Sequence, residues 1–116
     1  MLIVLAGPAA AQQAYPNKPI RFITPFPPGG STDPVLRLIA QKLTESWGQP
    51  VIADNRPGGN TVIGTEAVAK SPPDGYTILM TPSGSLIGTP LLQPTSYDLI
   101  RDFAPVATIA RGELAL

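Results

Sequence analysis

The chain has 116 residues, about the length of one domain, and its eight basic residues balance its eight acidic ones. Cysteine and histidine are absent, which excludes disulfides, thiolate nucleophiles, imidazole acid–base catalysis and Cys/His metal sites. No cluster of lysine or arginine stands out, so nucleic acid is not an expected partner. Fifteen prolines and eleven glycines accompany a hydrophobic content of 43%, which predicts a packed core with these residues in defined loops.

The first fourteen residues have the pattern that ends a secretory signal peptide. Residues 1–11 are apolar or small and end in Ala9-Ala10-Ala11, a small-x-small pattern of the kind that signal peptidase cleaves. The alternative interpretation is a short buried strand, because the charged region that normally precedes such a run is missing. We predict that residues 1–14 are the remnant of a signal peptide, with a mature N-terminus between Gln12 and Tyr15.

Strand and helix patterns alternate beyond residue 14. β-Branched and aromatic residues predict a strand over Ile20–Thr24, and apolar residues at three- and four-residue spacing predict a helix from Asp33 to Gly48, capped by Ser31 or Thr32. Weaker patterns predict strands at Val51–Asp54, Tyr76–Thr81 and Phe103–Arg111, and helices at Thr61–Lys70 and from Ser83 or Ser85 to Leu92. Strands that begin roughly 30 residues apart are typical of βαβ units. The sequence therefore predicts an α/β fold with a mostly parallel sheet.

Glycine- or hydroxyl-rich loops follow the first three predicted strands. In open α/β sheets, ligands bind outside the carboxyl ends of the strands, where helix N-termini present free N–H groups and a partial positive charge. We therefore expect an anionic ligand there, although the glycines could also serve only to relieve crowding at the turns. The loops are Phe26 to Thr32, Asn55 to Asn60 and Thr81 to Ser85.

These loops match no common catalytic or nucleotide-binding motif. No lysine closes a glycine run as in a Walker phosphate loop, and neither G-x-G-x-x-G nor G-x-S-x-G occurs. Without histidine, the hydroxyls of Ser31, Ser83 and Ser85 lack the usual activating base and suit hydrogen bonding better than nucleophilic attack. Asp33 lies in the first helical turn, where we expect it to hold the loop through backbone N–H groups rather than to touch ligand.

Arg56 and Trp47 each allow a ligand-binding and a structural interpretation. The planar guanidinium of Arg56 suits a carboxylate clamp, but a surface ion pair with Asp54 is favoured. Trp47 lies on the apolar face near the end of the first helix, which favours packing over ligand stacking. Phe22 and Tyr76 are core candidates for the same reason.

Six motifs in order resemble those of one receptor family. They are Tyr15-Pro16-Asn17-Lys18-Pro19-Ile20, Phe26-Pro27-Pro28-Gly29-Gly30 with Asp33, Gly48-Gln49-Pro50-Val51, Asn55-Arg56-Pro57-Gly58, Pro73-Asp74-Gly75-Tyr76-Thr77 and Asp102-Phe103-Ala104-Pro105-Val106. Over residues 15–110 the sequence is similar to the extracytoplasmic solute receptors of tripartite tricarboxylate transporters, the Bug family. One departure is Gly58-Gly59-Asn60-Thr61, where a Gly-Ala/Gly-Gly run is more usual, so no backbone contact from that loop is inferred.

The resemblance implies a type II periplasmic binding-protein fold, in which two lobes close around a small carboxylate. Residues 15–102 would form the first part of lobe one and residues 103–116 a strand toward lobe two, so that the chain is an N-terminal fragment, truncated before lobe two is complete. By analogy, two loops hold the ligand through backbone N–H and hydroxyl groups. The first loop contributes Phe26, Pro27, Gly29, Gly30, Ser31 and Asp33, and the second contributes Thr81, Ser83, Gly84 and Ser85.

The function that this resemblance implies is transport and not catalysis. We expect a periplasmic receptor that binds a di- or tricarboxylate or an amino acid and delivers it to the membrane subunits of the transporter, without a cofactor or metal. Two alternatives remain: an α/β enzyme that uses Asp33 and Ser31 on a small anionic or phosphorylated substrate, and a truncated fragment without function.

Overall fold

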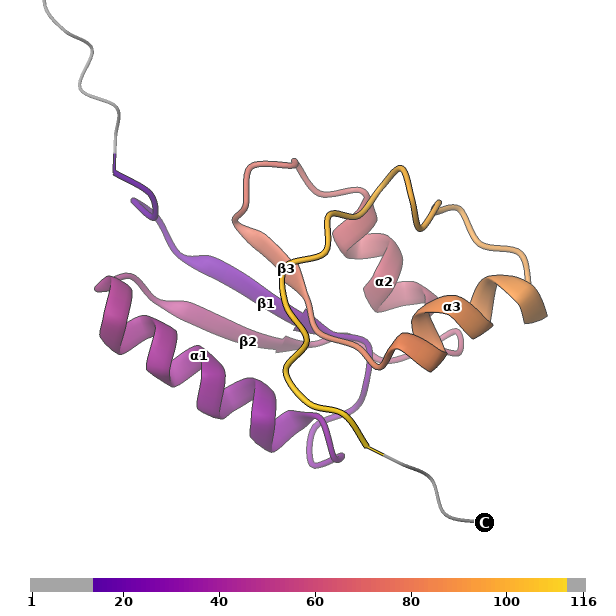
Figure 1. Cartoon of the computed structure of the whole chain (residues 1–116), viewed down its shortest axis with the longest axis horizontal. Helices are drawn as coiled ribbons and strands as arrows, with labels where there is room; N and C mark the ends of the chain where they lie inside the picture. Colours follow the sequence, from indigo (N-terminus) through magenta and orange to yellow (C-terminus); the bar gives the residue numbers. More distant parts are fainter. Residues whose placement is uncertain (1–13, 113–116) are drawn as a thin grey trace, which may run out of the picture.

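A parallel three-stranded sheet organises residues 14–112, the part of the chain that the computed structural model describes. The elements are β1 (Ile20–Thr24), α1 (Asp33–Trp47), β2 (Val51–Asn55), α2 (Val62–Ala69), β3 (Thr77–Leu79) and α3 (Ser83–Leu92). β1 is central and pairs in parallel with β2 and with β3, so the predicted parallel α/β arrangement is confirmed. Figure 1 shows α1 and α2 on opposite sides of the strands. The predicted signal-peptide remnant lies, except for Ala14, outside the described residues.

The core lies between the sheet and α1. Successive residues of a strand face opposite sides, so Ile20 and Phe22 both point toward α1, where they pack with Leu36. Burial of each such side chain stabilises the fold by roughly 1.5 to 3 kcal/mol. α1 ends as the sequence predicts: Gly48 adopts a left-handed conformation with φ 67°, and its N–H donates to the carbonyl of Thr44 at 3.0 Å.

The third strand is shorter than the sequence predicts. It covers Thr77–Leu79 instead of Tyr76–Thr81, although Met80 still donates its N–H to the carbonyl of Ile23 at 2.8 Å. β3 pairs only with β1, and Pro82, which has no N–H, follows three residues after its end. The ladder therefore ends early, and α3 begins directly after it.

The strand predicted over Phe103–Arg111 is absent from the structure. Residues 103–112 form neither helix nor strand, and every residue from Ala104 to Gly112 is exposed. A strand needs a neighbouring strand that pairs with its N–H and C=O groups, and neither β2 nor β3 pairs with this segment. The β-branched residues alone were therefore not sufficient to form a strand here. The domain boundary proposed at residue 103 is a separate point and stays a prediction.

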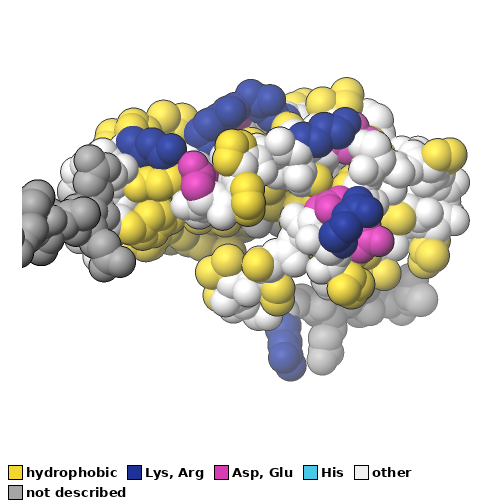
Figure 2. Space-filling view, turned by 90° about the horizontal axis from the view of Figure 1, so that it is seen from above, with side chains coloured by type: hydrophobic (Ala, Val, Ile, Leu, Met, Phe, Trp, Pro, Cys, Tyr) yellow, Lys and Arg dark blue, Asp and Glu magenta, His cyan; other side chains and the backbone are white. Residues whose placement is uncertain are grey.

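Large apolar side chains also lie on the surface. Figure 2 shows hydrophobic side chains in several places on one face, between basic and acidic groups. The most exposed are Leu91 and Leu92 of α3 and, further along the chain, Ile100 and Val106, each more than 80% exposed. The other described residues therefore leave these large apolar side chains uncovered.

Candidate functional site

The loops after all three strands begin side by side at one end of the sheet. Backbone hydrogen bonds continue past the strand ends, from Arg56 to the carbonyl of Thr24 and from Met80 to that of Ile23, both at 2.8 Å. The N-termini of α1 and α3 lie at this same end (Figure 1). We define the carboxyl edge as residues 24–33, 55–61 and 80–85, and it contains every residue predicted to bind ligand.

Asp33 holds the first loop of the carboxyl edge in place. The side chain is nearly buried, and its Oδ2 accepts hydrogen bonds from the N–H of Gly29 and from Nε of Arg37, both at 3.1 Å. Its Oδ1 accepts one from Nδ2 of Asn55 at 3.0 Å. The Arg37 hydrogen bond, followed by those from Gly29 and Asn55, lowers the pKa of Asp33 and favours its charged form. The predicted hydrogen bond from the loop backbone to Asp33 is confirmed.

Asn55 joins three parts of the carboxyl edge and was not among the predicted site residues. Its Nδ2 also donates to the carbonyl of Phe26 at 3.1 Å, while its Oδ1 accepts from Arg37 at 3.2 Å. The amide of Asn55 therefore joins the end of β2 to the first loop and to α1. The available signal was its place as the last residue of a strand, at the end of the sheet where ligands bind.

Gly29, and not its neighbour, needs the conformational freedom of glycine. Gly29 has φ 83°, a left-handed conformation that other residues adopt at a cost. A Cβ added at Gly30 would meet only the carbonyl oxygen of Pro27 at 3.5 Å, an ordinary contact. The conformation of Gly29 turns its N–H toward Asp33 and leaves the following residues at the surface.

Hydrogen-bond donors without partners gather at the carboxyl edge. Within the described residues, the backbone N–H groups of Ser31 and Thr32, which directly precede α1, donate to no acceptor. The same holds for Ser83 and Gly84, the first two residues of α3. Neither α1 nor α3 has a side-chain capping hydrogen bond. Two free backbone donors at the start of each helix can therefore receive an anion.

Three buried threonine hydroxyls add to these donors. Oγ1 of Thr24, Thr32 and Thr81 is buried without a partner among the described residues. Buried polar atoms are normally hydrogen-bonded, so these hydroxyls are available to a ligand or to water. The sequence analysis included Thr81, considered Thr32 only as a cap, and missed Thr24.

The other predicted site residues differ in exposure. Phe26, Gly30 and Ser85 are half-buried, whereas Pro27, Gly29, Ser31, Ser83 and Gly84 are exposed. The structure thus brings the two predicted loops to one edge, with small groups and backbone at the surface. Whether they contact a ligand remains a prediction.

Arg56 forms the ion pair that the sequence analysis favoured. Its Nε lies 2.9 Å from Oδ2 of Asp54, and the same oxygen lies 2.7 Å from the guanidinium of Arg21. Burial alone would raise the pKa of Asp54, but the hydrogen bonds from Arg21 and Arg56 outweigh this effect and lower it. The guanidinium of Arg56 is therefore engaged in a surface ion pair.

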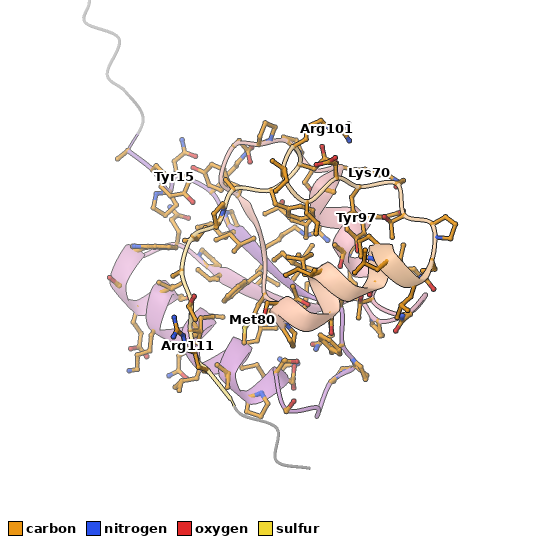
Figure 3. All side chains as sticks on the ribbon, turned by 45° about the vertical axis from the view of Figure 1, so that its right-hand side comes forward. Tyr15, Lys70, Met80, Tyr97, Arg101 and Arg111 are labelled. Atoms are coloured by element: carbon orange, nitrogen blue, oxygen red, sulfur yellow. The ribbon has the colours of Figure 1, made fainter. Side chains whose placement is uncertain are left out.

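A polar and aromatic cluster occupies the opposite end of the sheet. The hydroxyl of Tyr15 donates to the carbonyl of Gly75 at 2.6 Å, and its ring packs edge-on against Trp47 at 6.4 Å. Tyr76 accepts the N–H of Asn17 at 2.9 Å and donates to the side chain of Asn17 at 2.8 Å. We call Tyr15, Asn17, Lys18, Trp47, Asp74 and Tyr76 the amino-end cluster, and Figure 3 labels Tyr15 on it and Met80 at the carboxyl edge. The packing interpretation of Trp47 is confirmed.

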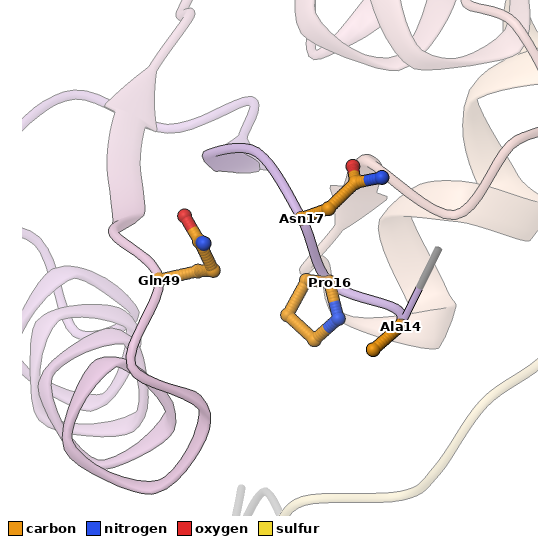
Figure 4. A pocket seen from close by; sticks show the side chains of 4 residues that line it. All are labelled: Ala14, Pro16, Asn17 and Gln49. Atoms are coloured by element: carbon orange, nitrogen blue, oxygen red, sulfur yellow. The ribbon is translucent and has the colours of Figure 1, made fainter. Parts of the chain in front are cut away.

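Two surface hollows are lined by residues outside the carboxyl edge. One is lined by Ala14, Pro16, Asn17 and Gln49, next to the amino-end cluster (Figure 4). A second lies between α1 and β2 and includes Thr44. Within residues 14–112, no group of three acidic, histidine or cysteine side chains can hold a metal, and no helix is long and apolar enough to cross a membrane.

Comparison with known protein families and curated proteins identifies the family of this chain. Residues 35–116 match the model described as "Tripartite tricarboxylate transporter family receptor". BugT of Bordetella pertussis is 44% identical over an alignment of 120 positions, which covers 100% of this chain and 37% of BugT. A UPF0065 protein of Pseudomonas sp. strain P51 is 41% identical over 92% of this chain and 35% of its own length. The chain thus spans little more than a third of these relatives.

Solved structures of similar proteins share the fold of this chain over the part that they match. Rpa4515 of R. palustris, solved with adipate, matches 61% of this chain and 24% of its own with a TM-score of 0.59 and 41% identity. MatC of Rhodopseudomonas palustris, solved with bound malate, matches 56% of this chain and 22% of its own with a TM-score of 0.53 and 34% identity. The chain therefore has the α/β fold of part of a periplasmic binding protein and belongs to the tripartite tricarboxylate transporter receptor family, a family of receptors and not of enzymes.

Proposed function

We propose that this chain is the amino-terminal part of a periplasmic solute receptor that binds a small organic carboxylate. The receptor delivers the carboxylate to the membrane subunits of a tripartite tricarboxylate transporter. The observation that carries the proposal is the gathering of unpaired backbone N–H groups and buried hydroxyls at the carboxyl edge. Such donors at helix N-termini are what a carboxylate needs.

The ligand carboxylate lies between the first turns of α1 and α3. Backbone N–H groups of Ser31 and Thr32 on one side and of Ser83 and Gly84 on the other donate to it, together with the hydroxyls of Ser31, Ser83 and Ser85. Phe26, Pro27, Gly29 and Gly30 shape the loop, and Thr81 contributes its hydroxyl. Each helix N-terminus adds roughly 0.3 to 1 kcal/mol of attraction for an anion near the surface.

Asp33 takes part in this site without touching the ligand. Its carboxylate is already bonded to Gly29, Arg37 and Asn55, and an anionic ligand in direct contact with it would be repelled. Arg37 on the same helix offsets that charge. The neutral donors of the loops therefore face the ligand, while the charged pair stays behind them.

The ligand class follows from the relatives and the donors together. Relatives were solved with adipate and with malate, both dicarboxylates. One carboxylate would lie at the carboxyl edge and the other would contact the second lobe of the longer receptor. A ligand that bridges two lobes favours the closed form, which is the state that the membrane subunits would recognise.

Calorimetry on the full-length receptor tests the proposal. Adipate and malate serve as probes, and Ser31→Ala should weaken binding by about 1 to 3 kcal/mol, the cost of a lost hydrogen bond to a charged group. Ser46→Ala, at the exposed far end of the same helix, is the matched control and should bind as wild type. Equal affinity for Ser31→Ala and Ser46→Ala, with tight binding in both, would show that the Ser31 hydroxyl does not contact the carboxylate. Absence of binding of both dicarboxylates to the wild type would contradict the proposal.

A further inference from the structure

The loop after β2 contains an unusual run of left-handed residues. Gly58, Gly59, Asn60 and Thr61 have φ values of 122°, 58°, 53° and 74°. Left-handed geometry brings the Cβ of an L-residue close to its own backbone, and it is least favourable for a β-branched residue such as threonine. Thr61 therefore occupies a conformation that it would not adopt without support from its surroundings.

That support comes from α3. Nε2 of Gln93 donates to the carbonyl of Gly59 at 2.8 Å, and Oγ1 of Thr89 donates to the carbonyl of Asn60 at 3.2 Å. The hydroxyls of Thr61 and Thr89 also lie 3.2 Å apart. Since the single proton of Thr89 goes to Asn60, Thr61 is the donor in that pair. Each of the three residues 59–61 thus has one hydrogen bond to α3 or the residue after it.

These same contacts hold α3 on the domain. Thr89 is the one buried residue of the helix, only 3% exposed, whereas Ile87, Leu91 and Leu92 are exposed. Pro90 lies inside the helix and removes one backbone donor. Apolar packing of α3 against the described residues is therefore sparse, and the polar contacts of Thr89 and Gln93 fix where the helix lies.

We propose that Thr89 and Gln93 are positioning residues for the carboxylate site. They bind the left-handed turn 59–61, and the turn in return fixes α3, whose first residues carry the donors of Ser83 and Gly84. This inference rests on the proposed function, because the site that it positions is the proposed one. Neither Thr89 nor Gln93 touches the ligand.

Three variants of the full-length receptor test the inference. Thr89→Val keeps the shape of the side chain but leaves the carbonyl of Asn60 and the hydroxyl of Thr61 unpaired. It should weaken adipate or malate binding about tenfold, the usual effect of one lost buried hydrogen bond. Thr89→Ser keeps the hydroxyl and should restore binding. Leu91→Ala, exposed on the same helix, is the control and should bind as wild type.

Hydrogen exchange of the ligand-free receptor provides the second readout. The N–H groups of Val62 and Ile63 bond to the carbonyls of Gly59 and Gly58, and those of Ser85 and Leu86 bond to the carbonyl of Pro82. Thr89→Val should speed amide exchange at both pairs, whereas Thr89→Ser and Leu91→Ala should leave both unchanged. Thr61→Gly combined with Thr89→Val should regain part of the lost affinity, because glycine removes the cost of the left-handed conformation.

Two results would overturn the inference. Thr89→Val could lower the melting temperature while affinity and exchange at Ser85 and Leu86 stay unchanged, which would make Thr89 a local structural residue only. Alternatively, Thr89→Ser could bind as weakly as Thr89→Val, which would exclude the hydroxyl as the cause. If the wild-type receptor binds neither adipate nor malate, the proposed dicarboxylate function fails, while exchange at Ser85 and Leu86 still decides the positioning role.

Discussion

The two ends of the sheet differ in how many of their polar groups have hydrogen-bond partners. In the amino-end cluster, Tyr15, Asn17 and Tyr76 bond to one another or to nearby backbone. The ammonium of Lys18 lies 3.1 Å from Asp74 and 4.3 Å from the centre of the Tyr76 ring. At the carboxyl edge, four backbone N–H groups and three buried hydroxyls have no partner among the described residues.

This difference separates structural polar groups from binding ones. A polar group that already has its partners stabilises the fold and gains little from a ligand. A buried hydroxyl without a partner has lost its contact with water on folding, and it recovers hydrogen-bond energy only when a partner arrives. The exposed N–H groups of Ser31, Ser83 and Gly84 can exchange water for an anion. Changes at the amino end should therefore alter stability alone, whereas changes at the carboxyl edge should alter binding.

Gly64→Ala should have the largest effect, because it breaks the carboxyl edge itself. A Cβ at Gly64 would lie 2.6 Å from the carbonyl oxygen of Arg56 and 2.8 Å from Cα of Pro25, both backbone atoms. α2 must then move away from the two loops, which should cost about 1 to 3 kcal/mol or more. Urea unfolding measures this loss.

The control for this substitution is Gly88→Ala in α3. Nothing lies within 4 Å of a Cβ at Gly88. Alanine should be neutral or stabilising there, by up to about 1 kcal/mol, since it favours helix more than glycine does. Equal stability of Gly64→Ala and Gly88→Ala would contradict the close approach of α2 to the loops.

Asp33→Asn should have the next largest effect, on binding. The amide keeps the shape of the side chain but loses the charge that holds Arg37 and the N–H of Gly29. The first loop should loosen, and adipate or malate affinity should fall on the order of tenfold. Calorimetry on the full-length receptor measures this, with Asp74→Asn in the amino-end cluster as the control. An unchanged affinity for Asp33→Asn would remove Asp33 from the site.

Low pH should weaken a third contact, which joins Glu66 of α2 to Ser96 in the segment after α3. Hydrogen bonds from the side chain of Ser96, from Lys70 and from the backbone of Ser96 lower the pKa of Glu66 from 4.5 to about 2. The folded state thus holds this proton less tightly than the unfolded state. The contribution of Glu66 to stability is complete above pH 4.5 and is lost as the pH falls toward 2.

Glu66→Gln should flatten this part of the pH dependence. Urea unfolding at pH 7, 4.5 and 3 should show a smaller loss of stability below pH 4.5 for the variant than for the wild type. The backbone N–H of Ser96 can still bond to the amide oxygen, so the variant should fold at neutral pH. An identical slope for both proteins would assign the acid sensitivity to other carboxylates.

Tyr76→Phe should weaken the amino-end cluster without affecting binding. It removes the hydroxyl that bonds the N–H and the side chain of Asn17, and it keeps the ring that packs against Tyr15. We expect a loss of about 1 kcal/mol in stability and an unchanged affinity for adipate and malate. A large loss of affinity would show that the two ends of the sheet are coupled.

The local sequence pattern correctly predicted the first strand, the helix after it and the second strand. The first strand, the helix that ends at Gly48 and the second strand follow from side-chain spacing and from one left-handed glycine, which are local properties. The position of the candidate site followed from topology, since the carboxyl ends of parallel strands meet at one edge. The motif with Asp33 lies on a loop at that edge, as expected, and its contact with a ligand stays a prediction.

Contacts between distant residues could not be predicted in the same way. Asn55 bonds to Phe26, 29 residues away, and Thr89 to Asn60, also 29 residues away. No periodicity links such pairs, so neither contact could be predicted from local pattern, although the place of Asn55 at the end of a strand was an available signal. The strand predicted over Phe103–Arg111 failed for a related reason, because strand formation depends on a partner that the local sequence does not specify.

Arg56→Ala should have the smallest effect, although arginine is the residue most suited to a carboxylate clamp. Its guanidinium is 40% exposed and shares Oδ2 of Asp54 with Arg21, which remains 2.7 Å away after the substitution. The charge of Asp54 therefore keeps a partner, and an exposed ion pair contributes only about 0 to 1 kcal/mol. Unfolding should show a small loss that salt diminishes further, and calorimetry should show nearly unchanged affinity for adipate and malate. A loss of affinity larger than that of Ser31→Ala would instead make Arg56 a ligand contact and would move the carboxylate toward the loop after β2.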